Sequence, residues 1–178
     1  MPNLARQDQF LTLLEEHKRI LFKVASSYCR NPADRDDLVQ EMTLQLWRSF
    51  ARYDERQRFT TWMYRVSLNV AISFYRREER RSRVTVPGDE SMFHIAAAKA
   101  DVAGLDDDLR ILQRLIERLD ALDRALVILY LDGNRHDTIA DVLGISDSNV
   151  GTKIGRIKQR IRREWESYSR EERVHGTR

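Results

Sequence analysis

Side chains suited to a core recur at alternating intervals of three and four positions along most of this chain. One such series runs through Phe10, Leu14, His17, Leu21, Val24 and Tyr28. Because an α-helix has about 3.6 residues per turn, this spacing gathers the side chains on one face. The chain has only 7 Gly and 3 Pro among 178 residues, too few for a sandwich or barrel. An all-α fold is therefore predicted.

Three helices are predicted in the first half of the chain, at about Asp8–Cys29, Ala33–Arg52 and Phe59–Arg81. Pro32 separates the first two, because the residue before a proline disfavours helical geometry. The predicted buried face of the second helix consists of Val39, Met42, Leu46 and Phe50. That of the third consists of Phe59, Met63, Val66, Val70 and Phe74.

The helical pattern stops after the third helix and returns at Leu109. The intervening segment contains Pro87-Gly88, small residues and mostly acidic charge, which is typical of a linker. We therefore expect two small helical domains, 1–83 and 108–170, joined by a flexible linker at 84–107. A charged tail is expected at 171–178.

The end of the second domain has the spacing of a helix-turn-helix. A small residue (Ala140), a turn glycine (Gly144) and an apolar anchor (Val150) stand at offsets of four and ten. Gly144 ends one predicted helix, and Ser146-Asp147-Ser148 offers capping side chains for the next. An ordinary helical hairpin with a basic surface is the alternative.

One face of the last helix is polar and basic: Asn149, Thr152, Lys153, Arg156, Arg160 and Arg163. No acid interrupts the run from Ser148 to Arg163. A face of one charge sign repels itself unless a polyanion neutralises it, and DNA does so with release of counterions. This helix is therefore predicted to enter duplex DNA.

Two further faces are candidate contact surfaces. The third helix carries a line suited to a single strand, because arginines bind phosphates and aromatic rings stack on bases: Trp62, Arg65, Asn69, Ser73, Arg76 and Arg80. The alternative for Trp62 is the core. The second helix exposes Leu44 among polar residues, which favours a protein contact, although a single exposed Leu needs no partner.

Composition and motifs exclude several functions. The single cysteine, Cys29, cannot form an internal disulfide, which fits a reducing cytoplasm. No Cys/His spacing is that of a metal site, and no phosphate loop or nucleophile motif occurs, so neither a cofactor nor enzyme activity is expected. No signal sequence or apolar run near 18 residues is present. A cytoplasmic protein without membrane insertion is predicted.

Two segments resemble the extracytoplasmic-function group of bacterial sigma factors. DRDDLVQEMTLQLWRSFARYDERQRFTTWMYRVSLNVAISFYRREERR, at 34–81, resembles the family's region 2. LDALDRALVILYLDGNRHDTIADVLGISDSNVGTKIGRIKQRIRR, at 119–163, resembles region 4. The resemblance implies a factor that directs core RNA polymerase to promoters and helps to open the DNA. It also implies a partner of the anti-sigma class.

The resemblance further implies roles for the three faces. The residues that would bind polymerase are Asp37, Leu38, Gln40, Glu41 and Leu44. Those that would capture the −10 element, with the loop at 53–58, are Phe59, Trp62, Arg65, Asn69 and Arg76. Those that would read the −35 element are Asn149, Thr152, Lys153, Arg156 and Arg160. Ser73, where the family often has Asp, and the SDSNV segment depart from the family pattern and bear on promoter preference.

A stand-alone helix-turn-helix regulator is the alternative function. Such a protein would bind duplex DNA without polymerase, usually as a dimer on a palindrome. The line from Trp62 to Arg80, which suits a single strand, is the feature against it.

Overall fold

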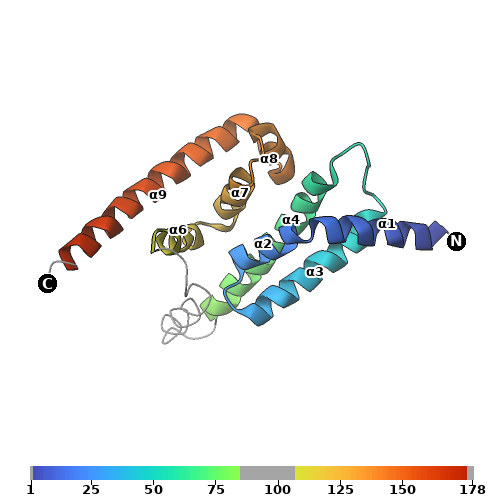
Figure 1. Cartoon of the computed structure of the whole chain (residues 1–178), viewed down its shortest axis with the longest axis horizontal. Coiled ribbons are helices and arrows are strands. Elements are labelled where there is room, and N and C mark those ends of the chain that lie inside the picture. The colour runs from blue at the N-terminus through green and yellow to red at the C-terminus, as the bar shows by residue number, and fades with distance from the viewer. Residues whose placement is uncertain (1, 85–106, 176–178) are drawn as a thin grey trace. The chain divides into compact units, whose positions relative to one another are not determined.

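The computed structural model describes residues 2–84 and 107–175, and no strand occurs within these two segments. The chain divides into two compact units, Met1–Gly88 and Asp89–Arg178. The predicted linker lies outside the described residues, except that Val84 ends one helix and Asp107 begins the next. The predicted all-helical fold is confirmed (Figure 1).

The first unit contains α1 (Pro2–His17), α2 (Arg19–Tyr28), α3 (Pro32–Phe50) and α4 (Phe59–Val84). Helices α2, α3 and α4 pack against one another in every pairing. Short polar segments join them, so neighbouring helices in the sequence are also neighbours in space (Figure 1). The core is built mainly from fully buried aliphatic side chains: Leu21, Val24, Leu38, Met42, Leu46, Met63 and Leu68.

The single helix predicted at Asp8–Cys29 is wrong in two respects. The helix starts earlier, at Pro2, and it is broken at Lys18 into α1 and α2. The Leu21 amide donates to the Lys18 carbonyl at 3.0 Å, which is the tighter i to i+3 pattern of a 3₁₀ turn. No glycine or proline stands at the break, so nothing in the local sequence predicts it.

Helix α3 begins as the sequence indicates. Asn31 caps it by accepting a hydrogen bond from the Ala33 amide at 3.0 Å, and Pro32 occupies the first helical turn. One predicted core residue is wrong, however. Val39 is half-buried, whereas its neighbour Leu38 is fully buried.

The predicted buried face of α4 is also displaced. Val66, Val70 and Phe74 are only half-buried. Because α4 packs against both α2 and α3, it buries two adjoining faces rather than one stripe. The residues that it buries are Phe59, Trp62, Met63, Tyr64, Ser67, Leu68 and Ala71.

The second unit contains α6 (Asp107–Glu117), α7 (Ala121–Leu131), α8 (His136–Leu143) and α9 (Asp147–His175). Helix α9 packs against each of the other three (Figure 1). The predicted anchor Val150 is buried on the inner face of α9, together with Ile154 and Ile157. The buried Arg124 of α7 donates to the Glu117 carbonyl at 2.6 Å, where a cation stabilises the C-terminus of α6.

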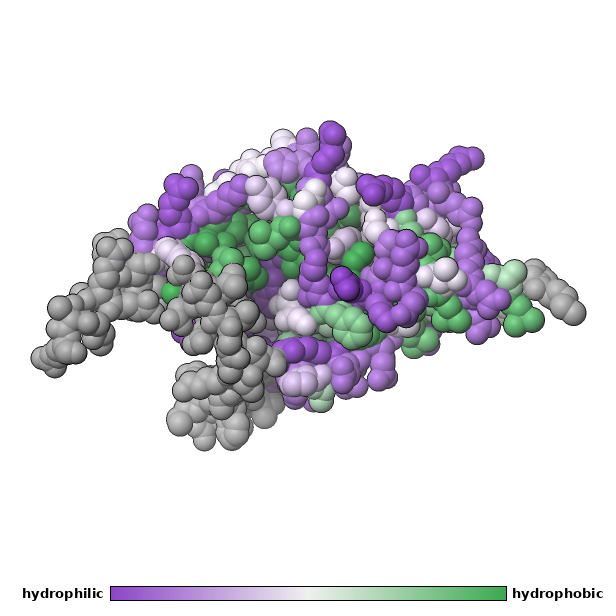
Figure 2. All heavy atoms as spheres, viewed as in Figure 1, coloured by the Kyte–Doolittle hydropathy of each residue, from purple (hydrophilic) through white to green (hydrophobic). Residues whose placement is uncertain are grey.

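Charged side chains dominate the exterior. Figure 2 shows hydrophilic side chains over much of the viewed face and apolar side chains gathered between them. Among the described residues, the large apolar side chains that remain exposed are few: Leu4, Leu11, Phe22, Leu44, Trp47, Tyr130 and Leu131. Four of these side chains belong to two helices of the first unit: Leu4 and Leu11 to α1, and Leu44 and Trp47 to α3.

Two leucines of α3 provide a matched test of this core. Leu46 is 0% exposed and Leu44 is 47% exposed. We expect Leu46→Ala to lower the free energy of unfolding by about 2–5 kcal/mol, because it removes buried contacts and leaves a cavity. Leu44→Ala should change it by less than about 0.5 kcal/mol. Urea denaturation followed by circular dichroism measures both values, and equal losses would contradict the burial of Leu46.

Candidate nucleic-acid interface

Helices α8 and α9 meet in the turn that the sequence predicts. Gly144 has φ +67°, in the left-handed region that glycine adopts without strain. The Ile145 amide donates to the Ala140 carbonyl at 3.2 Å, which closes the end of α8 in a Schellman arrangement. The Ser146 hydroxyl accepts from the Asn149 amide at 3.3 Å and caps α9. Two helices joined by this tight turn have the arrangement of a helix-turn-helix.

The outer face of α9 exposes the first turns of the helix to solvent. Asn149, Thr152 and Arg156 are all exposed. No acidic side chain of the described residues forms an ion pair with Arg156. Thr152 donates its hydroxyl only to the Ser148 carbonyl at 2.9 Å, one turn earlier. This part of the predicted duplex-binding face is therefore accessible.

Two other cations of the predicted face are held by acids. Lys153 Nζ lies 2.8 Å from Asp123 Oδ1 of α7. Arg160 Nε lies 2.9 Å from Glu164 Oε1 on the next turn of α9. The hydrogen bond from Arg160 holds the pKa of Glu164 below its ordinary value. The sequence predicted one uninterrupted basic face. In the structure, Lys153 and Arg160 of that face form ion pairs with acids, whereas Arg156 forms none with the described residues.

The line predicted on α4 is only partly exposed. Asn69 and Arg76 are exposed and Arg65 is half-buried. Phe59 and Trp62 are 7% and 8% exposed, so both rings are buried in this structure, and their predicted role in capture of the −10 element stays a prediction. Both rings are required by the core, which is the alternative that the sequence left open for Trp62.

An aromatic cluster joins these two rings to the loop between α3 and α4. Tyr53 lies 5.0 Å from Trp62 and stacks on Phe50 at 5.8 Å, measured between ring centroids. The Tyr53 hydroxyl donates to the Gln57 carbonyl at 2.7 Å, and burial raises the pKa of Tyr53. The cluster therefore fixes the shape of the 51–58 loop from inside.

Helix α1 supports the same loop, a role that the sequence analysis missed. Gln9 Nε2 donates to Glu55 Oε1 at 2.9 Å, and Arg6 Nη2 donates to the Phe50 carbonyl at 3.4 Å. These pairs are more than forty positions apart in the sequence. Neither periodicity nor a local motif can predict a contact between residues so far apart in the sequence.

The outer face of α3 differs chemically from the two basic faces. Asp37, Gln40 and Leu44 are exposed, as predicted. Leu38 is 0% exposed and lies in the core, and its predicted role in polymerase binding stays a prediction. Glu41 is exposed and lies 3.5 Å from Arg77 of α4, with both side chains about half accessible.

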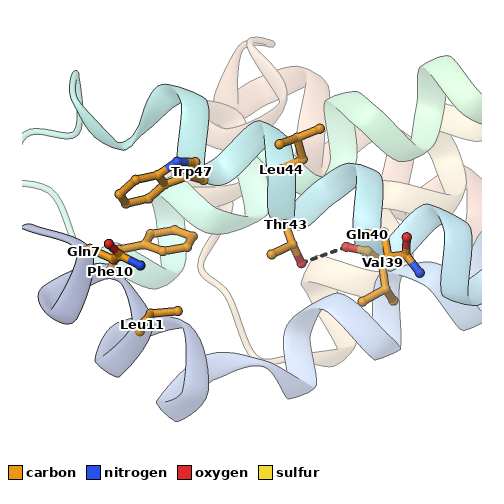
Figure 3. Close-up of a pocket in the computed structure, with 8 residues that line it drawn as sticks. All are labelled: Gln7, Phe10, Leu11, Val39, Gln40, Thr43, Leu44 and Trp47. Atoms are coloured by element: carbon orange, nitrogen blue, oxygen red, sulfur yellow. Dashed lines mark hydrogen bonds between the residues drawn. The ribbon is translucent and has the colours of Figure 1, made fainter. Parts of the chain in front are cut away.

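An apolar groove of about 630 Å³ lies between α1 and this face of α3. Figure 3 shows the side chains of both helices around it, with Leu44 and Trp47 on α3 and Phe10 and Leu11 on α1. The remaining lining residues are Gln7, Val39, Gln40 and Thr43. The sequence analysis identified Leu44 and Gln40 but missed the contribution of α1 and of Trp47, which is 37% exposed.

Within the residues that the structure describes, no group of three or more His, Cys, Asp or Glu side chains could hold a metal ion. In the same part of the chain, no helix has the length and apolar character needed to cross a membrane.

Comparison with known proteins identifies both units. The family model for Sigma-70 region 2 matches residues 13–81, and that for Sigma-70, region 4 matches residues 109–161. The chain is 23% identical to the ECF RNA polymerase sigma factor SigW of Bacillus subtilis over 167 residues, 89% of either protein.

Solved structures show the same fold. The structure of CnrH in complex with the cytosolic domain of CnrY matches with a TM-score of 0.65 at 22% identity, covering 90% of each chain. The sigma factor RpoE of Bartonella quintana, in complex with the anti-sigma factor NepR, also has a TM-score of 0.65, at 16% identity, with 90% of this chain and 96% of that one covered. With region 2 and region 4 both present and in this order, the chain belongs to the extracytoplasmic-function group of the sigma-70 family.

Proposed function

We propose that this sigma factor uses three separate surfaces to direct RNA polymerase to promoters. The proposed domains are 1–83, with the polymerase and −10 surfaces, and 108–170, with the −35 surface. The observation that carries the proposal is the helix-turn-helix with its accessible Asn149, Thr152 and Arg156, present together with a match to region 2 at 13–81. A stand-alone regulator is not favoured, because it would have no use for region 2.

The proposed polymerase surface is the outer face of α3 with the adjoining groove. Leu44 and Trp47 offer exposed apolar area, while Asp37, Gln40 and Glu41 supply polar groups around it. An apolar centre with a polar rim is typical of a protein interface. The groove between α1 and α3 can accept side chains from an apolar partner helix.

Replacing Leu44 and Gln40 together tests this surface. We expect Leu44→Ala with Gln40→Ala to weaken association with core RNA polymerase by tenfold or more, since loss of a hot-spot residue costs about 2 kcal/mol. Size-exclusion co-elution and titration with core polymerase, without DNA, measure the effect. Phe22→Ala is the matched control, because Phe22 is 51% exposed on α2, outside the proposed surface.

Failure of the wild-type chain to co-elute with core polymerase would overturn the proposed mode of action. Equal affinities of the wild-type and the double variant, with unchanged helicity, would exclude this face of α3. Run-off transcription by the reconstituted holoenzyme then tests promoter use directly.

The proposed −35 surface is the exposed start of α9. A recognition helix places its N-terminal residues against base edges in the major groove. Asn149 can donate and accept at one adenine, and Arg156 can contact phosphate or guanine. Lys153 and Arg160 are close to the same face, but their acidic partners compete with DNA for them.

Salt dependence distinguishes these cations. We expect Arg156→Ala to reduce the slope of log affinity against log salt by about 0.9, the value of one phosphate contact on duplex DNA. Fluorescence anisotropy of the full chain with duplex DNA measures this slope. Lys158→Ala is the control, because Lys158 is exposed on another side of α9 than Arg156 and donates to the Tyr130 hydroxyl at 2.6 Å. Equal reductions in the two variants would contradict a specific role of Arg156.

The proposed −10 surface combines α4 with the 51–58 loop. Asn69 and Arg76 provide an amide and a cation along α4, with Arg65 partly accessible beside them. Arg52, Arg56 and Arg58 of the loop are exposed and add positive charge. Phe59 and Trp62 support this surface from below by fixing the loop, instead of stacking on bases.

Promoter opening tests the α4 line separately from polymerase binding. We expect Asn69→Ala with Arg76→Ala to reduce the open-complex population several-fold while leaving co-elution with core polymerase intact. Permanganate reactivity of unpaired thymines in the −10 element measures opening. Wild-type reactivity in this variant would remove these residues from strand capture.

The family also suggests how this chain is regulated and where in the cell it acts. CnrH and the Bartonella quintana RpoE were each solved with a protein partner, and the partner of RpoE is an anti-sigma factor. We expect an anti-sigma partner for this chain as well. The proposed site of action is the cytoplasm, and the proposed role requires no catalytic chemistry or cofactor from the chain.

A further inference from the structure

Asp123 lies at the start of α7 with its carboxylate directed to the recognition helix. Its amide donates to Asp120 Oδ1 at 2.8 Å, so the Asp120 cap fixes the first turn of α7. Its own Oδ1 lies 2.8 Å from Lys153 Nζ. The two side chains are 21% and 28% exposed, so the ion pair is mostly shielded from water. The ion pair of Glu41 with Arg77 in the first unit is longer, at 3.5 Å, and both of its side chains are about half accessible.

Lys153 stands within the proposed DNA-reading face. It lies one turn after Asn149 and nearly one turn before Arg156, both of which are exposed. A phosphate bound at this face would therefore be within reach of a free lysine at position 153. The pairing with Asp123 removes that positive charge from a face that is otherwise basic.

We propose that Asp123 is a positioning residue that holds Lys153 against α7 and so withholds one phosphate contact from the recognition helix. This inference rests on the proposed function, in which α9 enters duplex DNA. Its consequence is a lower affinity for DNA of any sequence, while Asn149, Thr152 and Arg156 remain exposed for contact with DNA.

Competition between carboxylate and phosphate supports the proposal. For Lys153 to bind a phosphate, it must leave a shielded partner 2.8 Å away. Asp123 would then remain as an unpaired carboxylate near the DNA, and like charges at an interface are unfavourable. Phosphate contacts position a protein on DNA but carry no sequence information. Loss of one such contact therefore lowers the affinity for non-specific DNA as much as the affinity for specific DNA.

Salt titration of four proteins tests the proposal: the wild type, Asp123→Asn, Lys153→Ala and the double variant. Each full-length chain is titrated with duplex DNA of random sequence. Asp123→Asn should steepen the salt slope by about 0.9, so its affinity falls about 3–4-fold more than that of the wild type between 50 and 200 mM salt. Lys153→Ala should have the wild-type slope. The double variant should match Lys153→Ala, because the released cation is absent.

Two results with the variants that lack Lys153 would overturn the proposal. One is a slope for Lys153→Ala that is shallower than wild type by about 0.9, since Lys153 would then already contact phosphate. The other is steepening by Asp123→Asn that persists in the double variant, which would mean a general effect of losing an acid. If Asp123→Asn loses helicity, the slope of Lys153→Ala decides the question by itself.

The same titration separates this inference from the proposed function. A wild-type chain that shows no salt-dependent binding to duplex DNA contradicts the proposed role of α9. Salt-dependent wild-type binding, with an unchanged slope in a folded Asp123→Asn variant, contradicts only the role of Asp123.

Discussion

Burial of one face of α9 determines what its opposite face can do. Val150, Ile154 and Ile157 are held in the core of the second unit, and a helix turns by about 100° per residue. Asn149 and Arg156 must therefore point outward, about two turns of helix apart. The Gly144 turn and the Ser146 cap fix where this helix starts. The reading surface is thus a geometric result of packing on the other side of the helix.

The first unit depends on its core in the same way, but through aromatic rings. Phe50, Tyr53, Phe59 and Trp62 contact one another at ring-centroid distances from 5.0 to 6.5 Å. Such contacts stabilise a particular loop shape beyond their buried area. Buried rings can still decide where the loop presents its polar groups. In the proposed function, Trp62 and Phe59 therefore support the −10 surface.

Local signals in the sequence account for the parts of the fold that could be predicted. The Asn31 cap, Pro32 and the left-handed Gly144 each act within a few residues, so they can be identified without a structure. The break at Lys18 has no such signal, and the buried face of α4 depends on two neighbouring helices. The pairing of Lys153 with Asp123 joins positions 30 apart. Lys153 was predicted to contact DNA because the pattern of its own helix contains no information on the acid that α7 places beside it.

Solvent exposure decides which charged residues remain available to a partner. Glu41 and Arg77 are about half exposed and 3.5 Å apart, and surface ion pairs of this kind contribute little stability. In the proposed function, Glu41 can therefore exchange Arg77 for a partner on polymerase at small cost. The Lys153–Asp123 pair is shorter and more shielded, so water screens it less and exchange is harder. The two ion pairs therefore differ: in the proposed function, Glu41 lies in an interface where it can change partners, whereas Lys153 is held by Asp123 beside the exposed start of α9.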